Sequence, residues 1–520
     1  MGIPSYYKRL IDKFPRLVQK GVQIQGSDIL LMDFNCLVYQ CIRGDGILPY
    51  TSEGREEWER ALLHAVRAYT LKVWAAAGKP ARVFIGVDGV VPMAKIRQQR
   101  LRRFKSRWMA GLEAEAGVRR AGEEVWDTNA ITPGTEFMEK LGRTLHELAA
   151  VHSGWTVSAA DEAGEGEQKL MAWIRGTSPA ELTGKKVVVY GLDADLIILS
   201  LIAITREAAT TSGWSLLREL TEFEGGRAAG NGFGCLNVKE LLDVLGARVG
   251  MPVPEYIMEY ACGMTFLGND FLPHSLSVRM REGGHDILCK TLGEMHATGY
   301  RLVRGGRVQS DACLELVRRW SITEEWAIQE GFVTKYKMRP PPPRNERERL
   351  MRAFEELPIK WGAEAPLMAV GGVLAPGWKD TYRRLWLKGA PAEQVCGEYR
   401  AGLQWVVDYY LGKPVSYSWY FPWSVPPLWE DLERSFRADA PKSLKAPPPT
   451  LPVAPQEQLA MVLPMSSWWL IRDPRLKVLP STAPVFWPAS YGFFSAGRRW
   501  LWECEPDIPV LCVERLRQLV

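Results

Sequence analysis

Several features are scarce in this sequence of 520 residues, and each scarcity excludes a class of protein. No run of about 18 apolar residues is present, so a transmembrane helix is not expected. The nine cysteines are scattered without a C-x-x-C pair, which argues against a zinc site and against a disulfide framework. The six histidines show no pairing with a serine or cysteine nucleophile. The opening residues MGIPSYYKRL lack the apolar core of a signal peptide.

The composition that remains is that of an ordinary globular protein. Hydrophobic residues make up 47% and charged residues 24% of the chain, and the length predicts one large lobe or two smaller ones. The net charge is only +5, so binding to nucleic acid would require a local basic patch. The 21 tryptophans are numerous enough to include stacking platforms for bases, although most are expected in the core.

Short apolar runs alternate with segments of helical periodicity in the first part of the chain. The runs predict strands at residues 28–34, 83–87, 155–158 and 186–191. The periodic segments predict helices at residues 56–77, 134–151, 165–174, 195–204, 237–245 and 255–266. This alternation predicts an α/β fold with a mainly parallel central sheet flanked by helices.

A proline-rich stretch divides the chain. It predicts a linker at 336–353 between a first region, 1–335, and a second region, 354–520. The second region is expected to be helical and irregular and to pack on the first. Its tail, from residue 459, is expected to contain short strands at most.

Residues 83–107 combine a strand, a carboxylate and a strongly basic helix. Asp88 directly follows the predicted strand. Four polar side chains of the helix share one face because they stand at i, i+4, i+7 and i+8, namely Lys95, Gln99, Arg102 and Arg103. A carboxylate can hold a metal ion and a Lys/Arg cluster can hold a phosphate. The alternative is a solvated basic helix after an ordinary strand.

Further carboxylates recur at similar places. Asp33, Asp88 and Asp193 each end or closely follow a predicted strand, so they can meet at the carboxyl edge of the sheet. Glu165 and Glu167 are two residues apart and do not share a helical face. They can reach one site only at an irregular helix entry, and the same holds for Asp193 and Asp195. Oxygen ligands favour Mg²⁺ or Mn²⁺, whereas any single carboxylate could be a solvated turn residue or a helix cap.

Nine stretches in order resemble the XRN-type 5′→3′ exoribonucleases: MGIPSYYKRL, LLMDFN, VDGVVPMAKIRQQRLRRF, ITPGTEFM, GEGEQKLM, YGLDADLIILSL, LLREL, FLGNDFLPH and GLQWVVDYY…SYSWYFPW. The resemblance implies a PIN/5′-nuclease-like fold. It implies a compact member that carries only the two conserved catalytic regions, 1–335 and 354–520.

The resemblance also implies an activity and a metal site. The implied activity is processive 5′→3′ degradation of single-stranded, 5′-monophosphorylated RNA to mononucleotides. The implied mechanism is hydrolysis assisted by two bound Mg²⁺ or Mn²⁺ ions. The family's metal-binding carboxylates fall on Asp33, Asp88, Glu165, Glu167, Asp193, Asp195 and Asp270. A monomer in the cytoplasm or nucleus is expected, with decapping or RNA-processing partners that the sequence does not identify.

The family's pocket for the 5′-monophosphate falls on Lys95, Gln99, Arg102 and Arg103. The family's base-stacking histidine falls on Tyr39, where an aromatic ring can still stack. Its stacking partner is matched best by Trp419, with Tyr417 as the alternative. Core packing is the competing interpretation for these rings.

Two other functions compete with exoribonuclease activity. One is a catalytically silent RNA-binding or assembly factor, which would have no need for seven carboxylates. The other is a structure-specific 5′ flap nuclease, which would share the metal site. The phosphate pocket and the Trp-rich second region favour the exoribonuclease.

Overall fold

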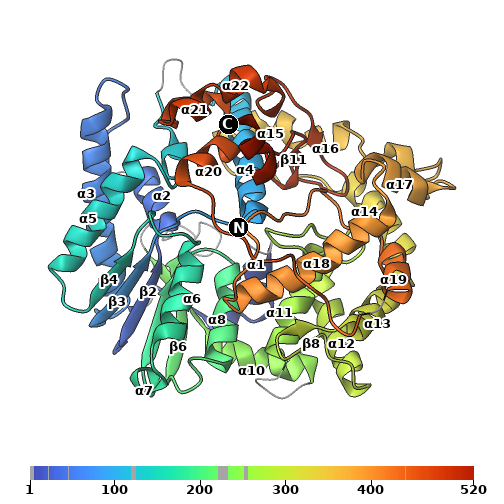
Figure 1. The fold of residues 1–520 in the computed structure, drawn as a ribbon, viewed down its shortest axis with the longest axis horizontal. Helices are drawn as coiled ribbons and strands as arrows, with labels where there is room; N and C mark the ends of the chain where they lie inside the picture. Colours follow the sequence, from blue (N-terminus) through green and yellow to red (C-terminus); the bar gives the residue numbers. More distant parts are fainter. Residues whose placement is uncertain are drawn as a thin grey trace.

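The computed structural model describes residues 5–21, 23–44, 46–118, 124–220, 232–250, 256–439 and 441–520. In this part of the chain seven strands form one sheet, in the order β1-β7-β6-β5-β2-β3-β4 (Figure 1). The strands are β1 (Val18–Lys20), β2 (Ile29–Asp33), β3 (Arg82–Gly86), β4 (Trp155–Ser158), β5 (Lys186–Tyr190), β6 (Gly213–Glu219) and β7 (Phe233–Asn237). The strands from β6 to β4 in this order pair in parallel, and β7 and β1 add antiparallel edges. The predicted mainly parallel sheet is confirmed.

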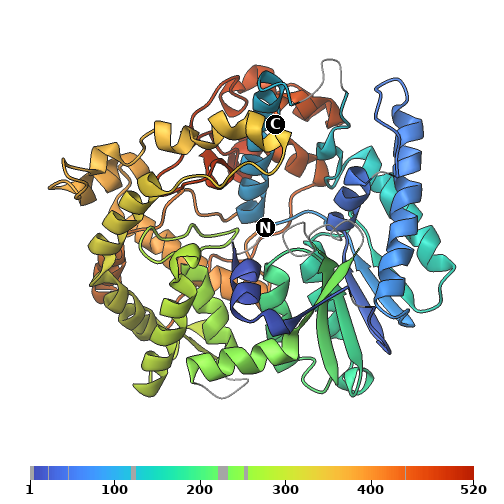
Figure 2. The same ribbon diagram turned by 180° about the vertical axis from the view of Figure 1, so that it is seen from behind.

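Helices cover both faces of the sheet (Figures 1 and 2). One face carries α2 (Asn35–Arg43), α3 (Arg55–Ala76) and α5 (Glu136–Ala150), and the other carries α6 (Gly166–Gly176), α8 (Asp195–Thr205) and α10 (Val238–Val249). The side chains of strand β2 point alternately to the two faces of the sheet. Leu30 and Met32 pack into one buried cluster, while Ile29 and Leu31 pack into the other.

The sequence did not predict β1, β6 or β7. Strand β7 reads FGCLN and presents no continuous apolar run. It is held by its backbone pairing with β6, from Ser215 opposite Asn237 to Glu219 opposite Phe233. Pairing of this kind depends on which strand lies alongside, and a local pattern does not reveal it.

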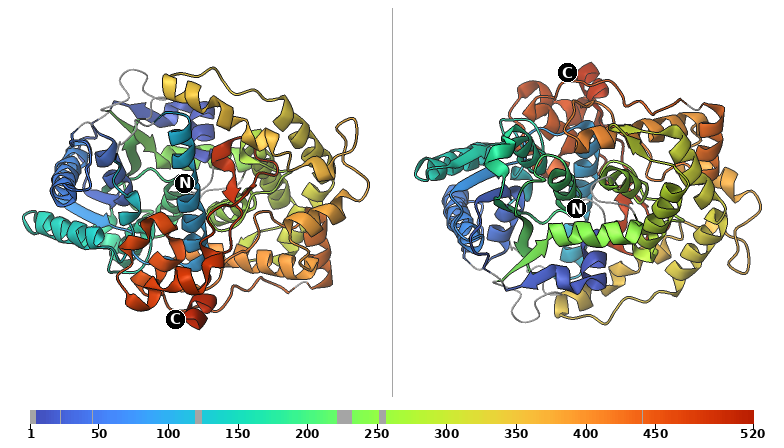
Figure 3. Two further views of the ribbon diagram at one scale, coloured as in Figure 1. Left: turned by 90° about the horizontal axis from the view of Figure 1, so that it is seen from above. Right: turned by 90° about the horizontal axis from the view of Figure 1, so that it is seen from below.

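A long helix, α4 (Met93–Glu115), follows β3 and runs through the middle of the molecule (Figure 3). The last part of the chain packs along the first half of α4, through α20 (Pro455–Val462) and the short strand β11 (Glu505–Pro506). The buried Arg100 guanidinium fastens this contact by donating hydrogen bonds to the carbonyl groups of Pro509, Met461 and Phe486.

The two buried clusters do not follow the predicted boundary between residues 335 and 354. One contains α11 (Ile257–Phe266) together with α17 (Trp378–Trp386), α18 (Ala392–Tyr410) and α19 (Trp429–Ala438). The other joins α3 and α5 to the tail, including α20 and α23 (Val513–Leu519). Each cluster therefore draws on both predicted regions, and the division into regions remains a prediction.

One local prediction was wrong. The tail from residue 459 is not limited to short strands, because α20, α21 (Pro474–Lys477), α22 (Leu479–Thr482) and α23 lie there. Three of these helices carry proline in the first turn, where its missing N–H costs nothing, and a proline-rich composition concealed them. The predicted linker 336–353 contains most of α15 (Glu346–Glu355), whose Asn345 cap accepts the N–H of Glu348.

The predicted helix at 255–266 is α11, and its first residue, Glu255, lies outside the described residues. The remaining elements are α1 (Tyr6–Lys13), α7 (Pro179–Leu182), α12 (Gly284–Ala297), α13 (Ser310–Ser321), α14 (Glu324–Lys337), α16 (Leu357–Lys360), β8 (Val303–Arg304), β9 (Arg307–Val308) and β10 (Phe493–Phe494). Among the helices described, none combines the length and the apolar character needed to cross a membrane.

Candidate active site

Acidic side chains gather at the carboxyl edge of the parallel strands. Asp33 is the last residue of β2, which lies between β3 and β5 in the sheet. Asp88 follows the end of β3, and Asp193 follows the end of β5. The side chain of Asn35 holds Asp88 in place, because its Nδ2 donates to Asp88 Oδ2 at 2.9 Å. The predicted convergence of these strand ends is therefore present.

Glu165 and Glu167 enter the site at the start of α6, as their spacing requires. Glu165 is the N-cap residue and Glu167 lies in the first turn. Between them, the Gly166 N–H donates to Asp88 Oδ1 at 2.7 Å. A Cβ on Gly166 would lie 2.6 Å from Asp33 Oδ1, so a larger residue would push the helix away from the carboxylates. The glycine lets the two glutamates approach the strand ends.

Asp195 is the first residue of α8 and is buried. Its backbone N–H approaches Asp193 Oδ1 at 3.4 Å. Among the described residues, neither of its own carboxylate oxygens has a hydrogen-bond partner. Buried anionic oxygens without protein donors are typical of a site that takes a cation.

Lys95 extends from α4 into this acidic cluster. Its Nζ lies 2.5 Å from Glu165 Oε2 and 2.7 Å from Asp270 Oδ2. The other oxygen of Asp270 accepts from Gln98 Nε2 at 3.3 Å, and the other oxygen of Glu165 accepts from the Tyr409 hydroxyl at 2.5 Å. One ammonium group thus bridges a carboxylate of α6 and one from the loop after α11.

The pKa values of the cluster show that its members act on one another. Burial, and then the charges of Asp88 and Asp193, raise the pKa of Asp33 well above its ordinary value. The pKa of Asp195 is raised by burial and then by Asp193 and Asp270. Burial and then Glu165 raise the pKa of Glu167. Charges this close repel unless cations neutralise them.

The atoms of the cluster that could bind a metal are carboxylate oxygens at one edge of the sheet. Oxygen ligands of this type favour a hard divalent cation. Within the described residues, no group of three or more acidic, histidine or cysteine side chains has the arrangement of a formed metal site. The ion pairs of Lys95 offer a reason, since they hold Glu165 and Asp270 in the orientation that suits an ammonium group. The chemistry of the residues fits Mg²⁺ or Mn²⁺, while their present positions fit Lys95.

The side chains on the basic face of α4 lie in different environments, some buried and some exposed to solvent. Lys95 is buried among the carboxylates, whereas Arg102 is exposed. Arg103 donates from Nη1 to Asn129 Oδ1 at 2.8 Å, and burial lowers its pKa to about 10. Gln99 Oε1 receives a long contact from Gln458 Nε2 at 3.5 Å. The helix therefore places the four predicted phosphate-binding residues along one line, beginning at the acidic cluster.

The two predicted stacking rings lie in different environments. Tyr39 is half-buried on α2, near Arg103. Trp419 is only 9% exposed, and its Nε1 donates to Glu398 Oε2 at 2.8 Å. Its ring packs against Trp405, with ring centroids 5.3 Å apart. These contacts are those of a core tryptophan.

Tyr417, the alternative to Trp419, lies beside the acidic cluster. Its carbonyl accepts the N–H of Met93, the first residue of α4, at 2.9 Å. Burial and then the charge of Glu165 raise the pKa of its half-buried hydroxyl. Of Trp419 and Tyr417, Tyr417 is therefore the one that lies near the acidic cluster.

Sequence reasoning missed three residues that support the site, Asn35, Gln98 and Tyr409. Asn35 and Tyr409 lie in the stretches LLMDFN and GLQWVVDYY, so their motifs were noticed but their roles were not. Gln98 lies one position from the predicted face of α4, and only the path of the loop around Asp270 brings it into contact.

Comparisons with known proteins identify relatives of this chain by sequence. A family described as "XRN 5'-3' exonuclease N-terminus" matches residues 1–219, and one described as "Xrn1 helical domain" matches residues 374–519. The chain is 29% identical to 5'-3' exoribonuclease 1 of Saccharomyces cerevisiae over 347 residues, which cover 58% of this chain and 21% of that protein. It is 31% identical to 5'-3' exoribonuclease 2 of the same yeast over 358 residues, which cover 55% of this chain and 35% of that protein.

The corresponding protein of Cryptococcus neoformans var. neoformans serotype D is 28% identical over 425 residues, which cover 64% of this chain and 37% of the relative. The chain thus spans about a fifth to a little over a third of the length of these curated relatives. The two family matches together cover more than half of the chain. With its parallel sheet and the acidic edge in place, the chain belongs to the XRN family of 5′→3′ exoribonucleases.

Proposed function

We propose that this protein is a metal-dependent exoribonuclease that degrades 5′-monophosphorylated, single-stranded RNA from its 5′ end to mononucleotides. The observation that carries the proposal is the acidic cluster at the strand ends and helix entries, in which burial and then neighbouring carboxylates raise the pKa values of Asp33, Glu167 and Asp195. A protein that only binds RNA would gain nothing from concentrating negative charge beside a basic helix.

The residues of α4 would set the direction of degradation. Arg102, Arg103 and Gln99 would bind the terminal phosphate, because guanidinium groups match the geometry of phosphate oxygens. Lys95 begins the same face and pairs with Glu165 and Asp270, so a phosphate bound there would lie next to the carboxylates. Holding the 5′ end at this point places the first phosphodiester over the acidic cluster.

The carboxylates Asp33, Asp88, Glu165, Glu167, Asp193, Asp195 and Asp270 would hold two Mg²⁺ or Mn²⁺ ions. When bound, such ions activate a water and stabilise the leaving oxygen of a phosphodiester. For that to occur, Lys95 must release Glu165 or Asp270, and an arriving phosphate is the natural new partner for its ammonium group.

The direct test is digestion of one RNA sequence with a 5′-monophosphate, a 5′-hydroxyl or a 5′-triphosphate, in Mg²⁺ and in chelator. We expect metal-dependent release of mononucleotides from the monophosphorylated RNA and much slower loss of the other two. RNA that is bound but stays intact would identify a silent binding factor. Release of short oligonucleotides from branched substrates would identify a flap nuclease.

Tyr39 and Tyr417 are proposed to stack on the first base, with Trp419 confined to the core. Stacking on an aromatic ring contributes about 1–3 kcal/mol per base and tolerates any base. Tyr417→Ala should therefore shorten the run of nucleotides removed per binding event by about tenfold, which is about 1.4 kcal/mol. The run length is measured on a gel with excess competitor RNA added after binding.

The matched control is Tyr417→Phe, which keeps the ring and should keep the run length. Tyr39→His should likewise retain most of the activity, whereas Tyr39→Ala should not. A folded Tyr417→Ala protein with wild-type run length would remove Tyr417 from the stacking role. Trp419→Ala is expected instead to lower the thermal midpoint, since it empties a core position.

A further inference from the structure

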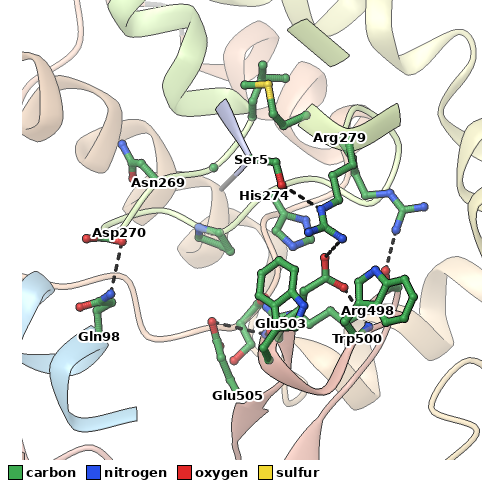
Figure 4. Close-up of a pocket in the computed structure, with 18 of the residues that line it drawn as sticks. Ser5, Gln98, Asn269, Asp270, His274, Arg279, Arg498, Trp500, Glu503 and Glu505 are labelled. Atoms are coloured by element: carbon green, nitrogen blue, oxygen red, sulfur yellow. Dashed lines mark hydrogen bonds and ion pairs between the residues drawn. The ribbon is translucent and has the colours of Figure 1, made fainter. Parts of the chain in front are cut away.

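A cavity of about 510 Å³ lies next to the acidic cluster (Figure 4). It is enclosed by one side of α4, the loop of residues 267–274 after α11, the segment 279–282 and residues 497–506 of the tail. This volume is in the range of sites for small organic ligands. It is large enough for a single nucleotide and too small for a length of RNA.

The cavity and the acidic cluster share a wall. Asp270 and Gln98 line the cavity, while the same Asp270 accepts from Lys95 Nζ at 2.7 Å on the other side. Arg102, from the proposed phosphate-binding face of α4, lines the cavity as well. Asp270 therefore borders both the acidic cluster and the cavity.

Positive charge exceeds negative charge around the cavity. Seven arginine and lysine side chains line it, against four carboxylates. Each carboxylate already has a cationic partner, in the pairs Lys95–Asp270, Arg279–Glu282, Arg281–Glu503 and Arg498–Glu505. Among the described residues, no carboxylate lies within ion-pair distance of Arg102, Lys105 or Arg499. The cavity thus has an electrostatic preference for an anion of more than one charge.

Unused hydrogen-bond donors gather in the same place. The Nε atoms of Arg97, Arg498 and Arg499 and the Nδ2 atom of Asn269 are buried and have no partner among the described atoms. All four belong to residues that line the cavity. Because these atoms are themselves buried, they belong to polar residues packed in the cavity wall and do not reach its interior.

The cavity also offers an aromatic surface. Trp500 and Trp502 line it, and Trp502 is 46% exposed. The Arg281 guanidinium lies over the Trp502 ring, 4.4 Å from its centroid. A ring with a cation beside it suits a flat base joined to a phosphate.

We propose that this cavity binds the nucleoside 5′-monophosphate released by each cleavage, which makes it a product site and an exit. The inference rests on the proposed function, because an enzyme that degrades RNA processively must discharge each nucleotide while the RNA still occupies the entrance. A dianionic phosphate joined to a planar base matches the charge surplus, the aromatic surface and the volume. Inorganic phosphate matches the charge surplus but has no base to stack on the aromatic surface.

The test is direct binding of adenosine 5′-monophosphate to the full chain, measured by calorimetry in chelator and without RNA. The double variant Lys105→Gln, Arg281→Gln should bind at least about tenfold more weakly, because it removes two cations that can bond to the phosphate oxygens. The matched control is Arg475→Gln, which removes an exposed arginine that also pairs with a carboxylate, Asp473. It should leave the affinity unchanged.

Lys105 donates to the Trp502 and Cys504 carbonyl groups, so the double variant must be checked for folding. Arg281→Gln alone changes a side chain that is 39% exposed and keeps the test decisive if the double variant unfolds. Adenosine and inorganic phosphate should each compete at least about tenfold less well than the nucleotide. Equal competition by phosphate would overturn the nucleotide assignment.

A loss of affinity in Arg103→Ala but not in the cavity variants would place the nucleotide in the 5′-end pocket and overturn the inference. Nucleotide binding that depends on Lys105 and Arg281, in a protein that degrades no RNA, would overturn the proposed function and leave the nucleotide site standing. RNA degradation without nucleotide binding at this cavity would overturn the inference alone.

Discussion

Asp195→Asn is expected to slow RNA cleavage more than about 100-fold while RNA binding persists. Both carboxylate oxygens of Asp195 are buried without a hydrogen-bond partner in the described structure, so the side chain is free to serve a cation. The substitution removes the charge at almost constant volume. Changing a residue that only supports a metal ligand typically lowers metal affinity or activity by about 10- to 100-fold. Loss of a ligand itself should lower the cleavage rate by more than that. The rate is measured under single-turnover conditions at saturating Mg²⁺.

The matched control is Asp161→Asn, which alters an exposed carboxylate in the loop that leads to α6. It should cleave RNA at the wild-type rate. Binding of Mn²⁺, followed by its paramagnetic resonance, supplies a readout besides activity and should weaken in Asp195→Asn alone. Wild-type cleavage by the Asp195 variant would show that this carboxylate holds no catalytic ion.

The double variant Arg102→Ala, Arg103→Ala should lose the preference for a 5′-monophosphate over a 5′-hydroxyl. Each guanidinium–phosphate contact contributes about 1.5–3 kcal/mol, so the ratio of the two rates should fall by at least about tenfold. The exposed Arg102 can be changed without disturbing the fold, whereas Arg103 also holds Asn129. Arg102→Ala alone should therefore give part of the effect in a fully stable protein.

Arg475→Ala is the control for this pair, because Arg475 is an exposed arginine on another helix, α21. It should leave the preference unchanged. If the double variant folds and still prefers the monophosphate by the wild-type ratio, the 5′ end is recognised elsewhere than on this face of α4.

The four predicted strands were found within one residue of their observed ends. Strands β2, β3 and β5 are buried apolar runs, whereas β4 reads WTVS and exposes Thr156. Burial on both faces makes such an apolar run visible in the sequence. Strands β6 and β7 were missed because backbone pairing, rather than a local apolar pattern, defines them. The tail helices were missed because their prolines occupy first-turn positions that composition alone does not distinguish from a loop.

For the acidic residues, too, the sequence predicted some features and only the folded structure showed the others. That Asp33, Asp88 and Asp193 would meet followed from their places after parallel strands, and the entry of Glu165 and Glu167 at a helix start followed from their spacing. That Lys95 would bridge Glu165 and Asp270 did not follow. This contact joins α6 to the loop after α11, which lie far apart in the chain, and no periodicity connects them.

The sequence by itself determined the parallel sheet, the family and the list of carboxylates, because these depend on local pattern and on short motifs in order. The tertiary structure decided that Trp419 lies in the core while Tyr417 borders the site, although the two residues are neighbours in one motif. It also decided that one side of α4 borders a cavity built from the tail and from the loop after α11. Both outcomes depend on which distant segments pack together, and such packing is a property of the whole chain that no single stretch carries.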